Sequence, residues 1–217
     1  MPVEVKICGV NSAEALGWAA AAGADFVGFV FFPASPRAVT PGQAAAISAT
    51  HPGGPRRVGL FVDPDDAALA ATLAAVRLDL IQLHGEETPE RVAAVRARFG
   101  LPVMKALGIG GEADLAAIAP HARVADRLLL DAKPPPGAAL PGGNAAPFEW
   151  ALARRAAIPV PWLLAGGLTP ANVAEALAAS GAPGVDVSSG VERARGVKDE
   201  GLIRAFIARA REAGDRG

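Results

Sequence analysis

Hydrophobic and polar positions along this chain follow two alternating patterns. Short apolar runs rich in β-forming residues are each followed by a stretch of Ala, Leu, Glu and Arg with helical spacing. The runs predict eight β-strands spaced about 20 to 35 residues apart: Glu4 to Cys8, Phe26 to Val30, Val58 to Val62, Leu80 to Leu83, Val103 to Ala106, Leu128 to Asp131, Trp162 to Ala165 and Val185 to Ser188.

Regular alternation of strand and helix predicts right-handed parallel βαβ units. Eight such units in about 200 residues fit a closed (β/α)8 barrel, the TIM barrel, of minimal size. A doubly wound open sheet is the main competing α/β architecture. We expect a single domain over residues 1–217, because a chain of this length with 51% apolar residues can bury roughly 70% of its unfolded surface around one core.

Residues that favour helix ends support this register. Polar capping residues, mostly paired with proline, precede the predicted first, third, fourth and seventh helices at Asn11-Ser12, Asp63-Pro64, Thr88-Pro89 and Thr169-Pro170. Glycines follow three helical stretches, at Gly23, Gly100 and Gly181. The segment 133–148, KPPPGAALPGGNAAPF, is too rich in Pro and Gly to continue an element, so we expect a mobile flap after the sixth strand.

Side chains of a barrel strand alternate between the surrounding helices and the interior. In the first strand this alternation points Lys6 and Cys8 inward, with Cys8 at the C-terminal end where barrel enzymes place their chemistry. It also points polar residues of three later strands inward: Gln82, His84, Asp131, Asp186 and Ser188. The residues alone leave alternatives open, since Cys8 can be a small buried hydrophobe and Asp131 a turn or capping carboxylate.

Two glycine-containing turns follow the last two predicted strands, in GGLTPANV and VDVSSGVE. Gly166 and Gly167 allow the backbone to approach an anion closely, and the amides there and around Ser189 and Gly190 can donate hydrogen bonds. Loops at these two positions commonly bind phosphate in barrels. The turns therefore predict a site for one phosphate monoester.

Arg37 lies in the loop FFPASPRAVTP after the second predicted strand, whose prolines limit its freedom. Its planar guanidinium is suited to binding a substrate carboxylate through two parallel hydrogen bonds. The alternative is a solvated surface arginine.

Composition narrows the classes of partner. The chain has 21 Lys+Arg against 22 Asp+Glu and no basic tract, so we expect neither nucleic acid nor membrane as a partner. Cys8 is the sole cysteine, which excludes an intrachain disulfide and a cysteine-rich zinc site. Without a signal-like N-terminus or a long apolar stretch, we expect a soluble cytoplasmic protein, monomeric or homodimeric, that acts on a small phosphorylated molecule.

Taken in order, these motifs resemble the phosphoribosylanthranilate isomerase family of tryptophan biosynthesis. The resemblance runs from residue 3 to residue 199 through KICGV, GADFVGFVFFPASPR, VGLFVD, LIQLHGEE, LLLDAK, GGLTPANV, VDVSSGVE and GVKD. KICG in the first strand together with QLHGEE in the fourth is specific to that family, whereas the glycine turns are shared by many barrels. The stretch GGNAAPFEW, 142–150, departs from the family's glycine-threonine/serine-glycine pattern.

The resemblance implies an Amadori rearrangement, which needs one acid, one base and no metal or redox cofactor. It implies that Cys8 is the general base, Asp131 the general acid, and Arg37 the partner of the anthranilate carboxylate. His84 and Asp186 are expected to position the substrate, or else to satisfy polar neighbours inside the barrel. Because a thiolate is needed, we expect a nearby cation to lower the pKa of Cys8 from about 8.5, with Lys6 as the candidate.

Three other functions remain open at this point. A lyase or aldolase would use an inward lysine, Lys6, Lys105 or Lys133, as a Schiff-base nucleophile. A related isomerase of histidine biosynthesis handles two phosphates, whereas only one anion site is evident here. A non-catalytic phosphate-binding barrel is the third possibility, and the presence of both Cys8 and Asp131 argues against it.

Overall fold

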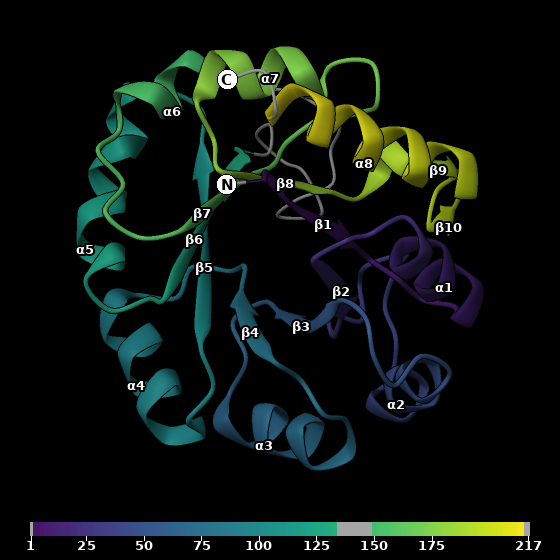
Figure 1. Ribbon diagram of the computed structural model, residues 1–217. Helices are drawn as coiled ribbons and strands as arrows, with labels where there is room; N and C mark the ends of the chain where they lie inside the picture. Colours follow the sequence, from purple (N-terminus) through teal and green to yellow (C-terminus); the bar gives the residue numbers. More distant parts are fainter. Residues whose placement is uncertain (1, 134–148, 215–217) are drawn as a thin grey trace.

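Eight parallel strands form a closed barrel in sequential order (Figure 1). The computed structural model describes residues 2–133 and 149–214. Its barrel strands are β1 (Glu4–Cys8), β2 (Phe26–Val30), β3 (Arg56–Phe61), β4 (Leu80–Leu83), β5 (Val103–Ile109), β6 (Arg127–Ala132), β7 (Trp162–Leu164) and β8 (Gly184–Val187). Because β1 pairs with both β2 and β8, the open-sheet alternative is excluded and the predicted (β/α)8 class is confirmed.

Helices surround the barrel on its outer side (Figure 1). They are α1 (Ala13–Ala21), α2 (Pro41–Ala49), α3 (Asp66–Ala75), α4 (Pro89–Phe99), the 3-10 helix η1 (Glu112–Ala117) with α5 (Ile118–Ala122), α6 (Ala151–Arg155), α7 (Val173–Ser180) and α8 (Glu200–Gly214). Between β8 and α8 the chain forms a short 3-10 helix, η2 (Ser189–Val191), and an antiparallel hairpin of β9 (Glu192–Ala194) and β10 (Val197–Lys198). The hairpin was not predicted.

Most of the predicted helix ends are confirmed, and two predicted starts are wrong. Ser12 and Thr88 cap α1 and α4, and Gly100 and Gly181 end α4 and α7 in the left-handed conformation. Helix α3 is capped by Asp65 instead of Asp63, whose carboxylate accepts a hydrogen bond from the Glu86 amide. Helix α7 begins at Val173 rather than after Thr169-Pro170, because the Asn172 side chain binds the Thr169 amide and the Gly167 carbonyl in a preceding turn.

The core has two parts that follow from the alternation of side chains along each strand. Outward residues such as Val5, Ile7 and Leu128 pack with the helices in one large cluster. Inward residues fill the barrel centre with a smaller cluster: Phe26, Val58, Leu80, Met104, Ala106, Leu129, Leu163 and Ala165. Apolar packing therefore occupies the middle of the barrel and leaves the C-terminal strand ends for polar groups.

The expectation that the Lys105 side chain points into the barrel is wrong. Its neighbours Met104 and Ala106 point into the barrel, so Lys105 points outward and is buried beneath the loop after β4. There its ammonium group binds the carboxylate of Glu87 at 2.8 Å and the carbonyl of Gly85 at 2.7 Å. Lys133, by contrast, has 58% of its side chain exposed and pairs with Asp114. Neither geometry fits a buried Schiff-base nucleophile inside the barrel.

The predicted flap falls almost entirely on residues 134–148, which lie outside the described residues. Among the helices of the described ranges, none is long and apolar enough to span a bilayer.

We predict that Lys105→Met lowers the free energy of unfolding by about 3–5 kcal/mol, because it leaves the Glu87 carboxylate buried without its counter-charge. Chemical denaturation followed by circular dichroism measures the change. Lys133→Met is the matched control, since the same substitution at an exposed ion pair should leave the denaturation midpoint unchanged. Equal effects of the two substitutions would contradict the prediction.

Candidate active site at the C-terminal strand ends

The thiol of Cys8 lies beside a buried ion pair at the junction of β1 and β8. The ammonium group of Lys6 binds Asp186 at 2.8 Å, and the two residues are direct partners in the strand register. A Cβ atom added to Gly28 would lie 3.0 Å from the Cys8 sulfur and 3.2 Å from the Lys6 nitrogen. The sulfur and the ammonium group thus share the space left by Gly28. The predicted inward orientation of Lys6, Cys8 and Asp186 is confirmed.

The environment of Cys8 acts on its pKa in opposing directions. Burial of the thiol raises the pKa, the Lys6 and Lys198 cations lower it, and the Asp186 anion raises it again. The net result is a raised pKa, because burial outweighs the cations. Lys6 therefore lowers the pKa of Cys8, as expected. The expectation that the pKa of Cys8 is lowered overall is wrong for the protein without substrate. The pKa of Lys6 itself is raised, since Asp186 and Cys8 outweigh the effect of burial.

Asp131 lies near the C-terminal end of β6 and faces His84. Nε2 of His84 is 3.3 Å from Oδ2 of Asp131, and both side chains are about one-tenth exposed. Nδ1 of His84 lies 2.9 Å from the amide nitrogen of Gln82, which donates to it. With Nδ1 as an acceptor, the ring proton sits on Nε2 and points at the carboxylate. Gln82 and His84 therefore hold Asp131 in place, with its other oxygen bound by the Ala132 amide at 2.8 Å.

Arg37 is 6% exposed, which excludes the alternative of a solvated surface arginine. Its Nε and Nη2 atoms donate to the two carboxylate oxygens of Glu192 at 2.7 and 3.0 Å. The side chain also crosses Gly9, where an added Cβ would lie 2.6 Å from the Arg37 Cδ atom. Since Gly9 directly follows Cys8, the guanidinium lies next to the reactive end of β1.

The two glycine turns after β7 and β8 pack directly against each other. An added Cβ at Gly190 would lie 1.8 Å from the Leu168 carbonyl oxygen, and one at Gly166 would lie 2.6 Å from the Ala132 amide nitrogen. Gly166 and Gly167 have φ angles of 89° and 66°, which favour glycine. Within residues 2–133 and 149–214, the amides of Gly167, Ser189 and Gly190 donate to no other backbone or side-chain group. The turns thus form a compact cradle of free donors beside the Asp131 strand end.

Glu192 and Lys198 are site residues that the sequence reasoning missed. They face each other across the β9–β10 hairpin, with the Lys198 ammonium 2.9 Å from Glu192 and 2.9 Å from the Ser188 carbonyl. Hydrogen bonds from Arg37 and Lys198 outweigh burial and lower the pKa of Glu192 to about 2. The motif VDVSSGVE with GVKD contains both residues, but nothing in their spacing indicates that they pair with Arg37.

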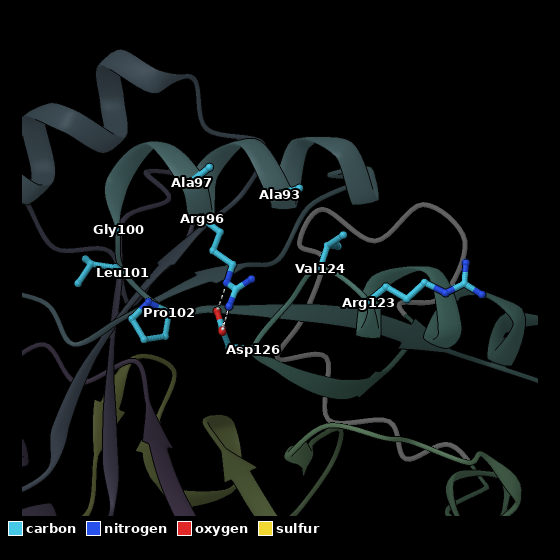
Figure 2. A pocket seen from close by; sticks show the side chains of 9 residues that line it. All are labelled: Ala93, Arg96, Ala97, Gly100, Leu101, Pro102, Arg123, Val124 and Asp126. Atoms are coloured by element: carbon cyan, nitrogen blue, oxygen red, sulfur yellow. Dashed lines mark hydrogen bonds and ion pairs between the residues drawn. The ribbon is translucent and has the colours of Figure 1, made fainter.

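A surface groove elsewhere does not compete with this site. It lies where the chain enters β5 and β6 (Figure 2). Cys8 and Asp131 lie at the other end of their strands. The charged groups Arg96 and Asp126 satisfy each other across it in a salt bridge at 2.8 Å. The groove is lined by Ala93, Arg96, Ala97, Gly100, Leu101, Pro102, Arg123, Val124 and Asp126. In the described ranges, no group of three or more His, Cys, Asp or Glu side chains is placed to hold a metal ion.

Comparisons with known proteins agree with this geometry. The family model described as N-(5'phosphoribosyl)anthranilate (PRA) isomerase matches residues 5–209. The N-(5'-phosphoribosyl)anthranilate isomerase of Paramagnetospirillum magneticum is 61% identical over 211 residues, which cover 97% of this chain and 98% of the relative.

Solved structures show the same similarity. The phosphoribosyl anthranilate isomerase of Thermotoga maritima has a TM-score of 0.87 and 36% identity, and the similarity covers 97% of this chain and 99% of that one. A phosphoribosyl anthranilate isomerase in complex with reduced 1-(o-carboxyphenylamino)-1-deoxyribulose 5-phosphate has a TM-score of 0.83 and 35% identity, with the same coverage.

We predict that the Cys8 thiol titrates above its ordinary pKa of about 8.5 and that Asp186→Asn lowers the midpoint, because this variant removes a negative charge that raises the pKa. Thiolate absorbance in the ultraviolet reports the titration without interference, since the chain has one cysteine and no tyrosine. Asp66→Asn, which removes a half-buried carboxylate on the outer helix α3, is the control and should leave the midpoint unchanged. A lower midpoint in the unmodified protein than in a free thiol would contradict the prediction.

Proposed function

We propose, for a chain that belongs to the N-(5'-phosphoribosyl)anthranilate isomerase family, that Cys8 is the general base and Asp131 the general acid of the reaction. The chain isomerises N-(5'-phosphoribosyl)anthranilate to 1-(2-carboxyphenylamino)-1-deoxyribulose 5-phosphate in tryptophan biosynthesis, by general acid–base catalysis. One observation carries the assignment of the two residues. Cys8 and Asp131 lie at the same end of the barrel, each with its own buried polar partners and each beside a potential anion-binding group.

The first step in this proposal is ring opening. Asp131, in its protonated form, donates to the furanose ring oxygen, and the C–O bond breaks to give a Schiff base between the sugar and the anthranilate nitrogen. His84 supports this role, because its Nε2 lies 3.3 Å from Asp131 and orients that carboxyl group. Gln82 keeps the imidazole in the required tautomer through its contact with Nδ1.

The second step is proton removal from the sugar carbon next to the Schiff base. The Cys8 thiolate takes this proton, and the resulting enolamine tautomerises to the ketone. Burial raises the pKa of Cys8 in the free protein, so the thiolate must form when the substrate is bound. The positive charge of the protonated Schiff base, together with Lys6 and Lys198, favours the thiolate at that moment.

Substrate binding uses both ends of the mouth in this proposal. The free amides of Gly167, Ser189 and Gly190 hold the phosphate, with Gly166 at the start of the first turn and Ser188 at the start of the second. The unpaired edge of the Arg37 guanidinium holds the anthranilate carboxylate. Asp186 acts on the substrate indirectly in this arrangement, because its carboxylate is bound to Lys6.

Three further features belong to the proposal. The chain acts as one domain over residues 1–217, as a monomer or a homodimer. It works in the cytoplasm, where a lone free thiol at position 8 would stay reduced.

Cys8→Ala and Asp131→Asn are each expected to lower kcat by about 10² to 10⁴-fold, because each removes one proton-transfer group. Steady-state assays that follow anthranilate fluorescence measure the effect. The dissociation constant of reduced 1-(o-carboxyphenylamino)-1-deoxyribulose 5-phosphate should change little in both variants, since the binding groups remain. Near-normal turnover in either variant would refute the role of that residue.

Gly190→Ala is expected to weaken binding of a pentose phosphate by about tenfold or more, because its Cβ would meet the Leu168 carbonyl oxygen at 1.8 Å and force the two turns apart. Isothermal titration calorimetry measures the dissociation constant. Gly42→Ala is the matched control, since an added Cβ there meets nothing within 4 Å. Unchanged affinity in Gly190→Ala would show that the phosphate binds elsewhere.

A further inference from the structure

The β9–β10 hairpin brings a carboxylate to Arg37 from a distant part of the chain. Glu192 lies 155 positions after Arg37, and the two side chains meet through two hydrogen bonds of 2.7 and 3.0 Å. The hairpin also packs on the loop before Arg37, because an added Cβ at Gly196 would lie 2.6 Å from the Pro36 carbonyl oxygen. The hairpin and the Arg37 loop therefore form one unit at the mouth of the barrel.

Every hydrogen-bonding position of the Glu192 carboxylate is used. Oε1 accepts from Nε of Arg37 and from Lys198, and Oε2 accepts from Nη2 of Arg37 and from the Gly196 amide at 3.0 Å. Its side chain is 4% exposed, so little water competes for these bonds. A carboxylate held by four donors cannot rotate without breaking several of them, and it therefore fixes the plane of the guanidinium.

The contact with Glu192 occupies only one edge of Arg37. Within the described residues, Nη1 of Arg37 has no hydrogen-bond acceptor. The aliphatic part of the Arg37 side chain lies on Gly9, the residue after Cys8, so the guanidinium is held near the reactive end of β1. A guanidinium has five donors and can hold one carboxylate inside the protein while it offers the remaining donors to another.

The side chains around Arg37 also carry more positive than negative charge, which favours an anionic ligand. Two cations, Arg37 and Lys198, share the single negative charge of Glu192, which is ionised at all ordinary pH values because its pKa is about 2. Lys198 in turn donates to the Ser188 carbonyl at 2.9 Å, at the start of the turn that contains Gly190. Glu192 thus links the corner that offers Arg37 to the glycine turns.

We propose that Glu192 is a positioning residue that makes the enzyme selective for substrates with a carboxylate on the aromatic ring, by holding Arg37 with one edge free at the barrel mouth. The inference rests on the proposed role of Arg37 in binding that carboxylate. It requires that loss of Glu192 weakens recognition of the carboxylate while recognition of the sugar phosphate persists. A purely structural role in the hairpin would weaken both together.

The test compares two ligands that differ only in this group: reduced 1-(o-carboxyphenylamino)-1-deoxyribulose 5-phosphate and its phenylamino counterpart without the carboxylate. Calorimetry gives the dissociation constant of each for the unmodified enzyme, Glu192→Gln, Arg37→Met and the control Glu200→Gln, which alters an exposed ion pair on α8. For Glu192→Gln we expect about tenfold weaker binding of the carboxylate ligand and a change within about twofold for the other. Arg37→Met should lose the same preference, and Glu200→Gln should keep it.

The outcomes separate the two proposals. If Arg37→Met loses the preference for the carboxylate but Glu192→Gln keeps it, or if Glu192→Gln weakens both ligands equally, the positioning role is overturned while the role of Arg37 stands. If Arg37→Met keeps the preference, the assignment of Arg37 fails and the inference fails with it.

A second variant covers the case in which Glu192→Gln does not fold. Glu192→Asp keeps the charge but is one methylene shorter, so it cannot reach Arg37 and the Gly196 amide together. We expect it to lose part of the carboxylate preference and to raise KM more than it lowers kcat. An unchanged preference in the folded Glu192→Asp enzyme would overturn the proposal.

Discussion

The buried ion pair between Lys6 and Asp186 is the interaction on which the site depends. It joins the first and last strands of the barrel at the point where the sheet closes, and it lies directly below Cys8. Removing two charges from water is costly, and a buried pair of this kind often adds little net stability compared with apolar packing. Its consequence here is electrostatic, because it places one cation and one anion within reach of the only thiol in the chain.

Alternation of side chains explains why so much of the fold and site could be predicted. In strands β1 and β8, apolar residues alternate with polar residues or glycine, so the pattern itself separates the helix-facing side from the interior. The same rule corrects the expectation for Lys105. Its amine alone suggested an inward, catalytic position for Lys105. Its position between the inward residues Met104 and Ala106 shows that its side chain points outward. For Lys105, the alternation of side chains along the strand predicts the orientation correctly, and the residue type does not.

The rest of the site depends on contacts that no local pattern contains. Strands β9 and β10 have three residues and two, which is too short for alternation to be recognised. Glu192 meets Arg37, and Lys198 meets Glu192, only because the closed barrel places β2 and β8 on either side of β1, with their C-terminal ends at the same mouth. The wrong start predicted for α7 has a similar origin, since Asn172 binds the Gly167 carbonyl and so lengthens the glycine turn before the helix.

In the proposed binding mode, the two corners that hold anions differ in the kind of group they offer, and this difference suits a substrate with two unlike anions. The glycine turns offer backbone amides to the phosphate in this mode, and the two turns pack closely because Gly190 has no side chain to separate them. The corner around Arg37 offers a guanidinium whose plane is set by Glu192 in the proposed arrangement, a geometry that matches a flat carboxylate better than a tetrahedral phosphate. In this proposed mode, a substrate held at both ends has its reacting carbons fixed beside Cys8 and Asp131. The proposed mechanism therefore assigns binding and proton transfer to separate residues, because the groups that would hold the anions carry no proton that the reaction has to move.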